Sequence, residues 1–434
     1  MSDIAIVTAA IVLLGILIAV RVPIFVALGM SGLIGLFAVQ GLIGLDQVPI
    51  ALVTQLQNYS LMAAPLFIFM GEVLAVSGLG RDLFKAADRW FGRVPGGLAA
   101  SAIGSSTAFG AMSGVSISSV AVVGRMAVPE MLDRGYKPSY ASGSVVASGA
   151  LAMLIPPSLM FILYSSVTGV SVAALFAGGV VPGLLLSALM ITYVVVAAKV
   201  KPSLAPASPD RFTWEEKLSS LFRVVPAMAL ILVVLGSIYT GVATPTEAAA
   251  IGALGAILLV GVFYRALNWA NIKKALLATT EVSAALLAIV GSAFVFTKML
   301  VVVRIPDRVT NLVTGLDLAP VVVLLIMMGI LILLGCLVDA ASLLLVVTPI
   351  LLPAVVALGY DPLWLGVILV VNLEMAVITP PVGLNLYTIK SVVPSLDLGD
   401  IFRGIVPYLF IEAALLVVMV FFPDIALWLP ERVS

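Results

Sequence analysis

Apolar stretches about as long as a membrane is thick recur along the whole chain. Residues 4–20 and 23–45 are the first two, each bounded by charged or turn residues. About twenty consecutive apolar residues cross the hydrocarbon core of a bilayer as a helix, and a helix satisfies its own backbone groups there. Only 10% of the 434 residues are charged, against about 25% in soluble domains. The sequence therefore predicts an all-α polytopic membrane protein.

The apolar pattern predicts about ten transmembrane helices and two interrupted stretches. The expected crossings are 4–20, 23–45, 59–80, 138–170, 172–198, 224–242, 246–264, 277–303, 363–392 and 404–424. Stretches 97–135 and 318–358 are each broken halfway by small and polar residues. Each could form two crossings or one re-entrant hairpin, because non-helical backbone at membrane depth needs surrounding protein. Their Gly- and Ser-containing midpoints favour hairpins.

The distribution of charge predicts which side of the membrane each loop occupies. With both interrupted stretches as hairpins, most of the 22 basic residues fall on one side, and only Arg304, Arg308 and Arg432 fall on the other. The positive-inside rule makes the basic side cytoplasmic. Counting each hairpin as a double crossing gives the same sides. We therefore expect both termini to be periplasmic.

Missing residue types exclude several functions. The chain contains no histidine and a single cysteine, Cys336. This excludes Ser–His dyads, histidine-ligated metals, disulfides and zinc sites built on cysteine. There is no G-x-x-x-x-G-K-[ST] phosphate loop and no basic cluster with stacking aromatic residues that would bind nucleic acid. We expect no enzyme activity, no organic cofactor and no nucleic-acid partner.

The two halves of the chain carry the same motifs at a fixed offset of 224 residues. Residues 129–138 match 353–362 through a shared Pro…Gly-Tyr-x-Pro pattern, and Pro156-Pro157 falls on Pro380-Pro381. Five crossings lie between the hairpins, so the second hairpin enters from the side opposite to the first. Inverted repeats of this kind are typical of secondary transporters.

This repeat predicts the domain organisation. Residues 1–198 form the first repeat, with hairpin 97–135 and broken helix 138–170. Residues 224–434 form the second, with hairpin 318–358 and broken helix 363–392. The hydrophilic segment 199–223 is the cytoplasmic linker, and its Trp214-Glu-Glu-Lys-Leu pattern predicts a short interfacial helix.

The double prolines are the first candidate ion sites. A proline inside a helix lacks its N–H and displaces the carbonyl four residues earlier. The carbonyls of Ala152 and Met153, and those of Ala376 and Val377 in the second repeat, should therefore be released. Hard cations such as sodium bind oxygen, and unwound carbonyls at mid-membrane depth hold them in transporters.

Two other features bear on these sites. A simpler reading of each double proline is a kinked helix repaired by a neighbouring hydroxyl, Ser158 or Thr379. The hairpin midpoints offer partner groups: Ser113, Gly114, Ser116 and Ser119 in the first, and Asp339 and Ser342 in the second. Small residues there could equally serve helix packing, although a buried carboxylate such as Asp339 is costly without a counter-ion.

Further intramembrane charges are Glu72, Glu247, Glu281, Lys298, Glu374 and Glu412. Glu247 has a structural explanation, because Thr244-Pro-Thr-Glu247 is a capping box with proline at the first helical position. Glu374 lies near the second helix break and is the better functional candidate.

At these residues the sequence resembles the large membrane subunit of the tripartite ATP-independent periplasmic (TRAP) transporters, the DctM-like family. The resemblance covers nearly the whole chain. It is carried by Ser113–Gly124, Ile155-Pro-Pro-Ser158, Leu175-Phe-Ala-Gly-Gly-Val-Val-Pro-Gly183, Thr244-Pro-Thr-Glu-Ala-Ala249 and Thr379-Pro-Pro-Val-Gly-Leu-Asn385.

The resemblance implies an elevator-type carrier of the bacterial inner membrane, in which the hairpin tips meet the broken helices around sodium and substrate. It implies a small four-helix membrane subunit and a periplasmic protein that binds and delivers an organic anion. The implied first sodium site comprises Ser113, Gly114, Ser116, Ala152, Ile155 and Pro157. The second comprises Asp339, Ser342, Ala376, Thr379 and Pro381, and the implied substrate contacts are Ser119, Ser158 and Asn385.

We therefore expect sodium-coupled import of an organic anion, most simply a carboxylate. The alternative is a stand-alone sodium- or proton-coupled carboxylate transporter or exchanger of related elevator fold. A channel could use the same re-entrant tips as a filter, and saturable uptake without single-channel currents would exclude it.

Overall fold

A computed structural model describes residues 3–206 and 212–433, and within these ranges the chain forms helices and no strands. The all-α prediction is confirmed. The helices are α1 Asp3–Ala19, α2 Ile24–Gln40, α3 Leu42–Leu56, η1 Tyr59–Met62, α4 Ala63–Val76, α5 Leu79–Phe91, α6 Gly97–Ser113, α7 Ser116–Asp133, α8 Pro138–Ala150, η2 Leu151–Met153, α9 Leu159–Thr168, α10 Val172–Val200, α11 Trp214–Tyr239, α12 Pro245–Val262, α13 Trp269–Val302, α14 Ile305–Thr314, α15 Pro320–Gly335, α16 Ala340–Ala357, α17 Pro362–Ile378, α18 Leu384–Val392, α19 Leu398–Phe421, α20 Asp424–Leu427 and α21 Pro430–Val433.

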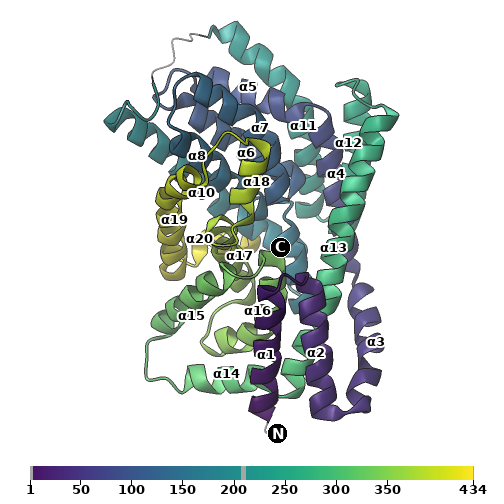
Figure 1. The fold of residues 1–434 in the computed structure, drawn as a ribbon. Helices are drawn as coiled ribbons and strands as arrows, with labels where there is room; N and C mark the ends of the chain where they lie inside the picture. Colours follow the sequence, from purple (N-terminus) through teal and green to yellow (C-terminus); the bar gives the residue numbers. More distant parts are fainter. Residues whose placement is uncertain (1–2, 207–211, 434) are drawn as a thin grey trace.

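One side of the molecule is a set of long helices packed on α13, which is 34 residues long. Helices α2, α3 and α4 pack against it, α1 packs on α2, and α12 packs on α4. Figure 1 shows α13 running along the right of the molecule beside α2 and α3. Gly32 of α2 permits this contact, because a Cβ there would lie 2.7 Å from the backbone nitrogen of Phe296. Small residues let membrane helices approach in this way.

The two interrupted stretches form helix pairs that break where the sequence predicted. The first pair is α6 and α7, and the second is α15 and α16. The base of the first pair lies beside the linker, because the Lys137 N–H donates to the Leu204 carbonyl at 3.0 Å. Its tip, Gly114, is buried against Pro157. A pair whose base is at one surface and whose tip is inside the protein is a hairpin, as expected.

The second hairpin has the opposite orientation. Near its base, Pro353 of α16 lines a cavity with Asp3 at the start of α1. Figure 1 shows the N-terminus and α14 at one end of the molecule and the linker at the other. The C-terminal α20 also packs away from the linker, since the Ala426 carbonyl lies at Gly178 in the first third of α10. The two hairpins therefore enter from opposite ends, as an inverted repeat requires.

Several boundaries differ from the sequence prediction. The expected crossing 23–45 ends at Gln40, because Gly41 has a φ of +63° and a separate helix, α3, begins at Leu42. The predicted short interfacial helix at Trp214 is instead the first turn of the 26-residue α11, capped by Thr213 and Glu216. Residues 207–211 of the linker lie outside the described ranges. Seven helices of the described segments are long and apolar enough to cross a membrane.

Two amphipathic helices, α5 and α14, were not predicted. Each connects the α13 side of the molecule with a hairpin: α5 precedes the first hairpin, and α14 precedes the second.

The capping box predicted at Glu247 is confirmed, because its carboxylate accepts from the Thr244 N–H and hydroxyl, each at 2.8 Å.

Helices α8 and α19 form the tightest crossing on the hairpin side. A Cβ on Gly404 of α19 would lie 2.0 Å from the Ser139 carbonyl oxygen, and one on Gly143 of α8 would lie 2.2 Å from the Gly404 carbonyl oxygen. The two backbones are therefore in contact, so the first half of α8, the helix that leads to the first break, is fixed against α19.

We predict that Gly404→Ala lowers the free energy of unfolding by about 1–3 kcal/mol, the usual cost of overpacking, because its methyl group overlaps Ser139. The midpoint of thermal unfolding of the purified protein in detergent measures this. Gly236→Ala is the matched control, since no described atom beyond its own helix backbone lies within 4 Å of its Cβ position. Equal midpoints for the two variants would contradict the crossing.

Candidate functional site

The tip of the first hairpin is formed by Gly114 and Val115, between α6 and α7. Gly114 has a φ of +62°, and its N–H donates to the Gly110 carbonyl at 2.9 Å. A Cβ on Gly114 would lie 2.4 Å from the Pro157 carbonyl oxygen. Glycine is thus required here both by backbone conformation and by contact with the first double proline.

The first broken helix unwinds between η2 and α9, over residues 154–158, which we call the first break. All five residues are buried, and the Pro156–Pro157 bond is cis. The Ser158 hydroxyl donates to the Met153 carbonyl. The sequence predicts a free Met153 carbonyl, but in the structure it accepts this hydrogen bond. This agrees with the alternative of a kinked helix repaired by a neighbouring hydroxyl. Ser158, an expected substrate contact, makes this bond to its own backbone.

Several polar groups near the first tip are buried and unpaired. The hydroxyls of Ser113 and Ser119 find no hydrogen-bond partner in the described part of the chain. Gly71 of α4 lies directly on the tip, because its Cβ would be 2.7 Å from the Ser113 Cα. Buried hydroxyls normally find a partner, so these oxygens fit a cation that takes oxygen ligands.

The second tip, residues 336–339, has an acidic cap in place of a serine cluster. One carboxylate oxygen of Asp339 accepts from the Ser342 N–H at 3.0 Å and caps α16. Its other oxygen, like the hydroxyls of Ser342 and Thr348, is buried without a partner among residues 3–206 and 212–433. The unpaired carboxylate oxygen fits a cation better than any other group at this tip.

The second broken helix unwinds over residues 379–383, the second break, between α17 and α18. Its Pro380–Pro381 bond is also cis. The Thr379 hydroxyl donates to the Met375 carbonyl at 2.5 Å, and the Thr379 N–H donates to the Ala376 carbonyl at 3.2 Å. The Tyr387 hydroxyl donates to the Pro381 carbonyl at 2.9 Å. Each of these carbonyls keeps one lone pair for a further ligand.

The two repeats bring tip and break together in the same way. In the first, Gly110 of α6 lies on Ala152, with its Cβ position 2.9 Å from the Ala152 Cα. In the second, Gly335 of α15 lies on Ala376, with its Cβ position 2.4 Å from the Ala376 Cβ. The Val382 N–H also donates to the Cys336 carbonyl at 3.3 Å. The predicted ligand residues of each sodium site therefore lie on elements that touch.

Hydrogen bonds at the first tip join it to the second repeat. Asn385, at the start of α18, exchanges hydrogen bonds with the Ser116 hydroxyl at 2.7 and 3.0 Å, and its Nδ2 approaches the Val146 carbonyl at 3.4 Å. The family resemblance implies Ser116 in an ion site and Asn385 in a substrate site. The structure pairs them, so α18 of the second repeat positions the first tip.

Two buried carboxylates lie outside the predicted sites. Glu374 and Glu412 are both fully buried, and none of their oxygens has a hydrogen-bond partner within the described ranges. Glu412 had no assigned role, and the sequence signal for it was only a charge in an apolar run.

No group of three or more Asp, Glu or Cys side chains in the described segments could hold a metal.

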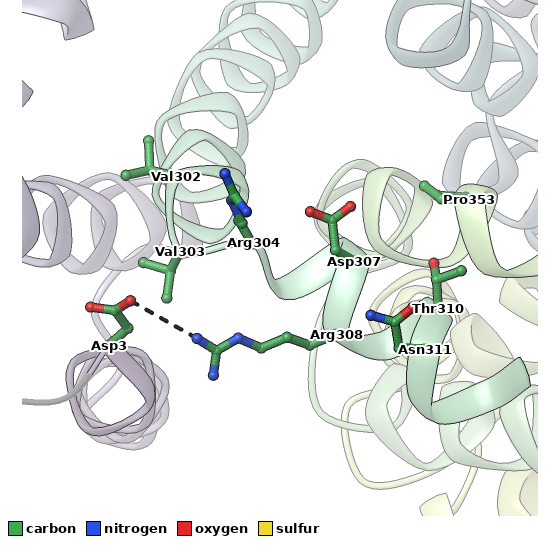
Figure 2. A pocket seen from close by; sticks show the side chains of 9 residues that line it. All are labelled: Asp3, Val302, Val303, Arg304, Asp307, Arg308, Thr310, Asn311 and Pro353. Atoms are coloured by element: carbon green, nitrogen blue, oxygen red, sulfur yellow. Dashed lines mark ion pairs between the residues drawn. The ribbon is translucent and has the colours of Figure 1, made fainter. Parts of the chain in front are cut away.

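A cavity of about 610 Å³ lies at the end of the molecule opposite the linker. Figure 2 shows its charged lining, with Arg308 reaching from α14 toward Asp3, 3.9 Å away. Arg304 and Asp307 also line it. Its two arginines are matched by two aspartates, so the cavity carries little net charge.

Residues 11–425 match the family model described as Tripartite ATP-independent periplasmic transporter, DctM component. The chain is 36% identical over 375 residues to the C4-dicarboxylate TRAP transporter large permease protein DctM of Pseudomonas aeruginosa, covering 86% of this chain and 87% of that one. It is 31% identical over 411 residues to the isethionate TRAP transporter permease protein DctMQ of Oleidesulfovibrio alaskensis, covering 95% and 64%.

A solved structure, the YdaH transporter of Alcanivorax borkumensis, superposes with a TM-score of 0.61 at 16% identity, covering 89% of this chain and 90% of that one. Its title describes an unusual topology. At this identity the likeness concerns the fold alone.

We predict that Gly114→Ala destabilises the protein more than Gly241→Ala does. Both glycines have positive φ, +62° and +70°, so each alanine costs about 1–2 kcal/mol in backbone strain. Only Gly114 is also in contact, at the Pro157 carbonyl, whereas no described atom lies within 4 Å of the Gly241 Cβ position. Thermal unfolding midpoints measure the difference. An equal loss of stability in the two variants would contradict the contact between the tip and the first break.

Proposed function

The chain belongs to the DctM family of tripartite ATP-independent periplasmic transporters, and from this membership we propose sodium-coupled import of an organic anion. The observation that carries the proposal is the repeated contact of a hairpin tip with a proline break. Each contact is lined by buried oxygens without partners, those of Ser113 and Asp339 above all. Sodium bound at each contact would supply the missing positive charge and hold the tip in place.

The proposed substrate class rests on chemistry that several of the relatives share. Their names give C4-dicarboxylates, isethionate and 2,3-diketo-L-gulonate as substrates of those proteins. These are small organic anions, and we propose the same class here. The N-terminal end of α18, which begins at Leu384, and that of α9, which begins at Leu159, would face the anion with their positive dipole ends.

We further propose an elevator movement in the bacterial inner membrane. The body formed by the hairpins, breaks and α19 would move against the body formed by α1–α4, α12 and α13. The connecting amphipathic helices α5 and α14 support this division, since each precedes one hairpin. Both termini would be periplasmic.

Two partners belong to the proposal: a small four-helix membrane subunit and a periplasmic binding protein that delivers the anion. The relative named DctMQ is longer than this chain, which covers 64% of it. That length leaves room for a second membrane component on the same polypeptide.

Reconstitution tests the coupling. With the small subunit and the binding protein present, we expect uptake of a labelled C4-dicarboxylate into proteoliposomes only under an inward sodium gradient. The control replaces sodium by potassium under a proton gradient. Uptake driven by protons alone, or uptake that needs no binding protein, would favour the stand-alone transporter instead.

Site variants test the assignment of sodium. Ser113→Ala should raise the half-saturating sodium concentration about tenfold, the effect of losing about 1.4 kcal/mol of binding. Ser106→Ala is the matched control, because its hydroxyl is buried and unpaired on the same helix, two turns from the tip. Thr379→Ala should act like Ser113→Ala, with Thr388→Ala as its control. Unchanged sodium affinity in Ser113→Ala and Thr379→Ala would remove both proposed sites.

A further inference from the structure

A charged cavity of about 370 Å³ lies between α4, α5, α7 and α13. It is at the linker end of the molecule, because α5 packs on α11 and the Arg89 guanidinium donates to the Glu216 carbonyl near the start of α11 at 2.9 Å. Its volume is within the range of small-molecule sites, about 300–1,000 Å³. Four charged side chains line it: Glu72, Arg81, Arg125 and Lys274.

Positive charge exceeds negative charge in this cavity. Glu72 is the one carboxylate of its lining, and it accepts a hydrogen bond from the Ser118 hydroxyl at 2.9 Å. Lys274 is close enough for its charge to act on Glu72. Arg81 and Arg125 form no ion pair with any described residue. Two cations therefore remain uncompensated, which suits an anion with one or two negative charges.

The cavity begins beside the first hairpin tip. Gly71, the neighbour of Glu72, lies on Ser113, and Ser118 is two residues beyond Ser116. Arg125 is seven residues further along α7, about 10 Å at the rise of a helix. The carboxylate is thus nearest the tip, and positive charge accumulates away from it, toward the linker side.

We propose that this cavity is an anion-binding vestibule through which a small organic anion leaves the first hairpin toward the linker side. Arg81, Arg125 and Lys274 attract the anion and hold it weakly. Glu72 repels it from the tip end, so the anion is held nearer the three cations than the tip. The identity of the anion as a transported carboxylate or sulfonate rests on the proposed function, whereas its attraction to the cavity does not.

The competing explanation is that these cations only set topology through the positive-inside rule. Lys273 distinguishes the two explanations, because Lys273 and Lys274 are adjacent and both exposed on α13 but only Lys274 lines the cavity. A topological role would be shared by Lys273 and Lys274. A role in attracting anions would belong to Lys274 alone.

Thiol modification tests the local charge without assuming transport. In inside-out membrane vesicles, Ala121→Cys places a thiol in the cavity lining, and the parent chain reports the background from Cys336. Anionic and cationic methanethiosulfonate reagents then compete for the same thiolate. We expect the anionic reagent to react faster, and Lys274→Gln or Arg125→Gln to lower the anionic-to-cationic rate ratio about fivefold per charge removed. Lys273→Gln should leave the ratio unchanged.

Two further measurements use the Ala121→Cys chain with no charge variant. Raising the salt concentration should bring the rate ratio toward one, and millimolar succinate, unlike neutral 1,4-butanediol, should slow the anionic reagent. The anion site would be overturned if the anionic-to-cationic rate ratio did not change with salt or with the Gln substitutions. It would also be overturned if succinate did not slow modification by the anionic reagent. Failure of sodium-driven uptake would remove the proposed function but would leave these ratios as they are.

Discussion

The structure depends on satisfying the backbone at the two proline breaks, of which the second is only partly enclosed, with Pro381 exposed, and the first is buried throughout. An unpaired peptide group in such a place costs several kcal/mol. The chain meets much of this demand with its own hydroxyls. Ser158 caps the Met153 carbonyl, Thr379 caps the Met375 carbonyl, and Tyr387 reaches the Pro381 carbonyl. The breaks are thereby stable without making every released carbonyl available to an ion.

The hairpin tips follow from the same constraint. A tip can cover a break closely only if its residues are small, which is why Gly110, Gly114 and Gly335 lie in direct contact with Ala152, Pro157 and Ala376. The polar atoms left over after this packing belong to side chains, notably Ser113 and Asp339. A cation site at either tip would therefore combine carbonyls that already accept one bond with side-chain oxygens that accept none.

The sequence predicted what local chemistry determines. Pro-Pro pairs and Gly-Ser midpoints fix where helices break, so both hairpins, both breaks and the capping box at Glu247 could be predicted. Amphipathic α5 and α14 were missed because apolar runs were the only signal used. The Trp214 helix was too short because its apolar continuation was assigned to a separate crossing. The Ser116–Asn385 bond joins residues 269 apart, and no local pattern specifies a contact at that distance. The cavity that Arg125 lines was not predicted either, because it forms only where α4, α5, α7 and α13 pack together.

The two charged cavities differ in net charge. At the end opposite the linker, Arg304 and Arg308 are matched by Asp3 and Asp307, and Asp3 already contacts Arg308. At the linker end, three cations face Glu72 alone. An anion would therefore find little net attraction at the first end, where a delivering protein would have to bring it. It would meet a positive field after passing the first tip. Fields of this kind raise local anion concentration and speed capture. Fixed charges act equally on departure and return, so the direction of net transport would be set by the proposed sodium gradient and not by this asymmetry.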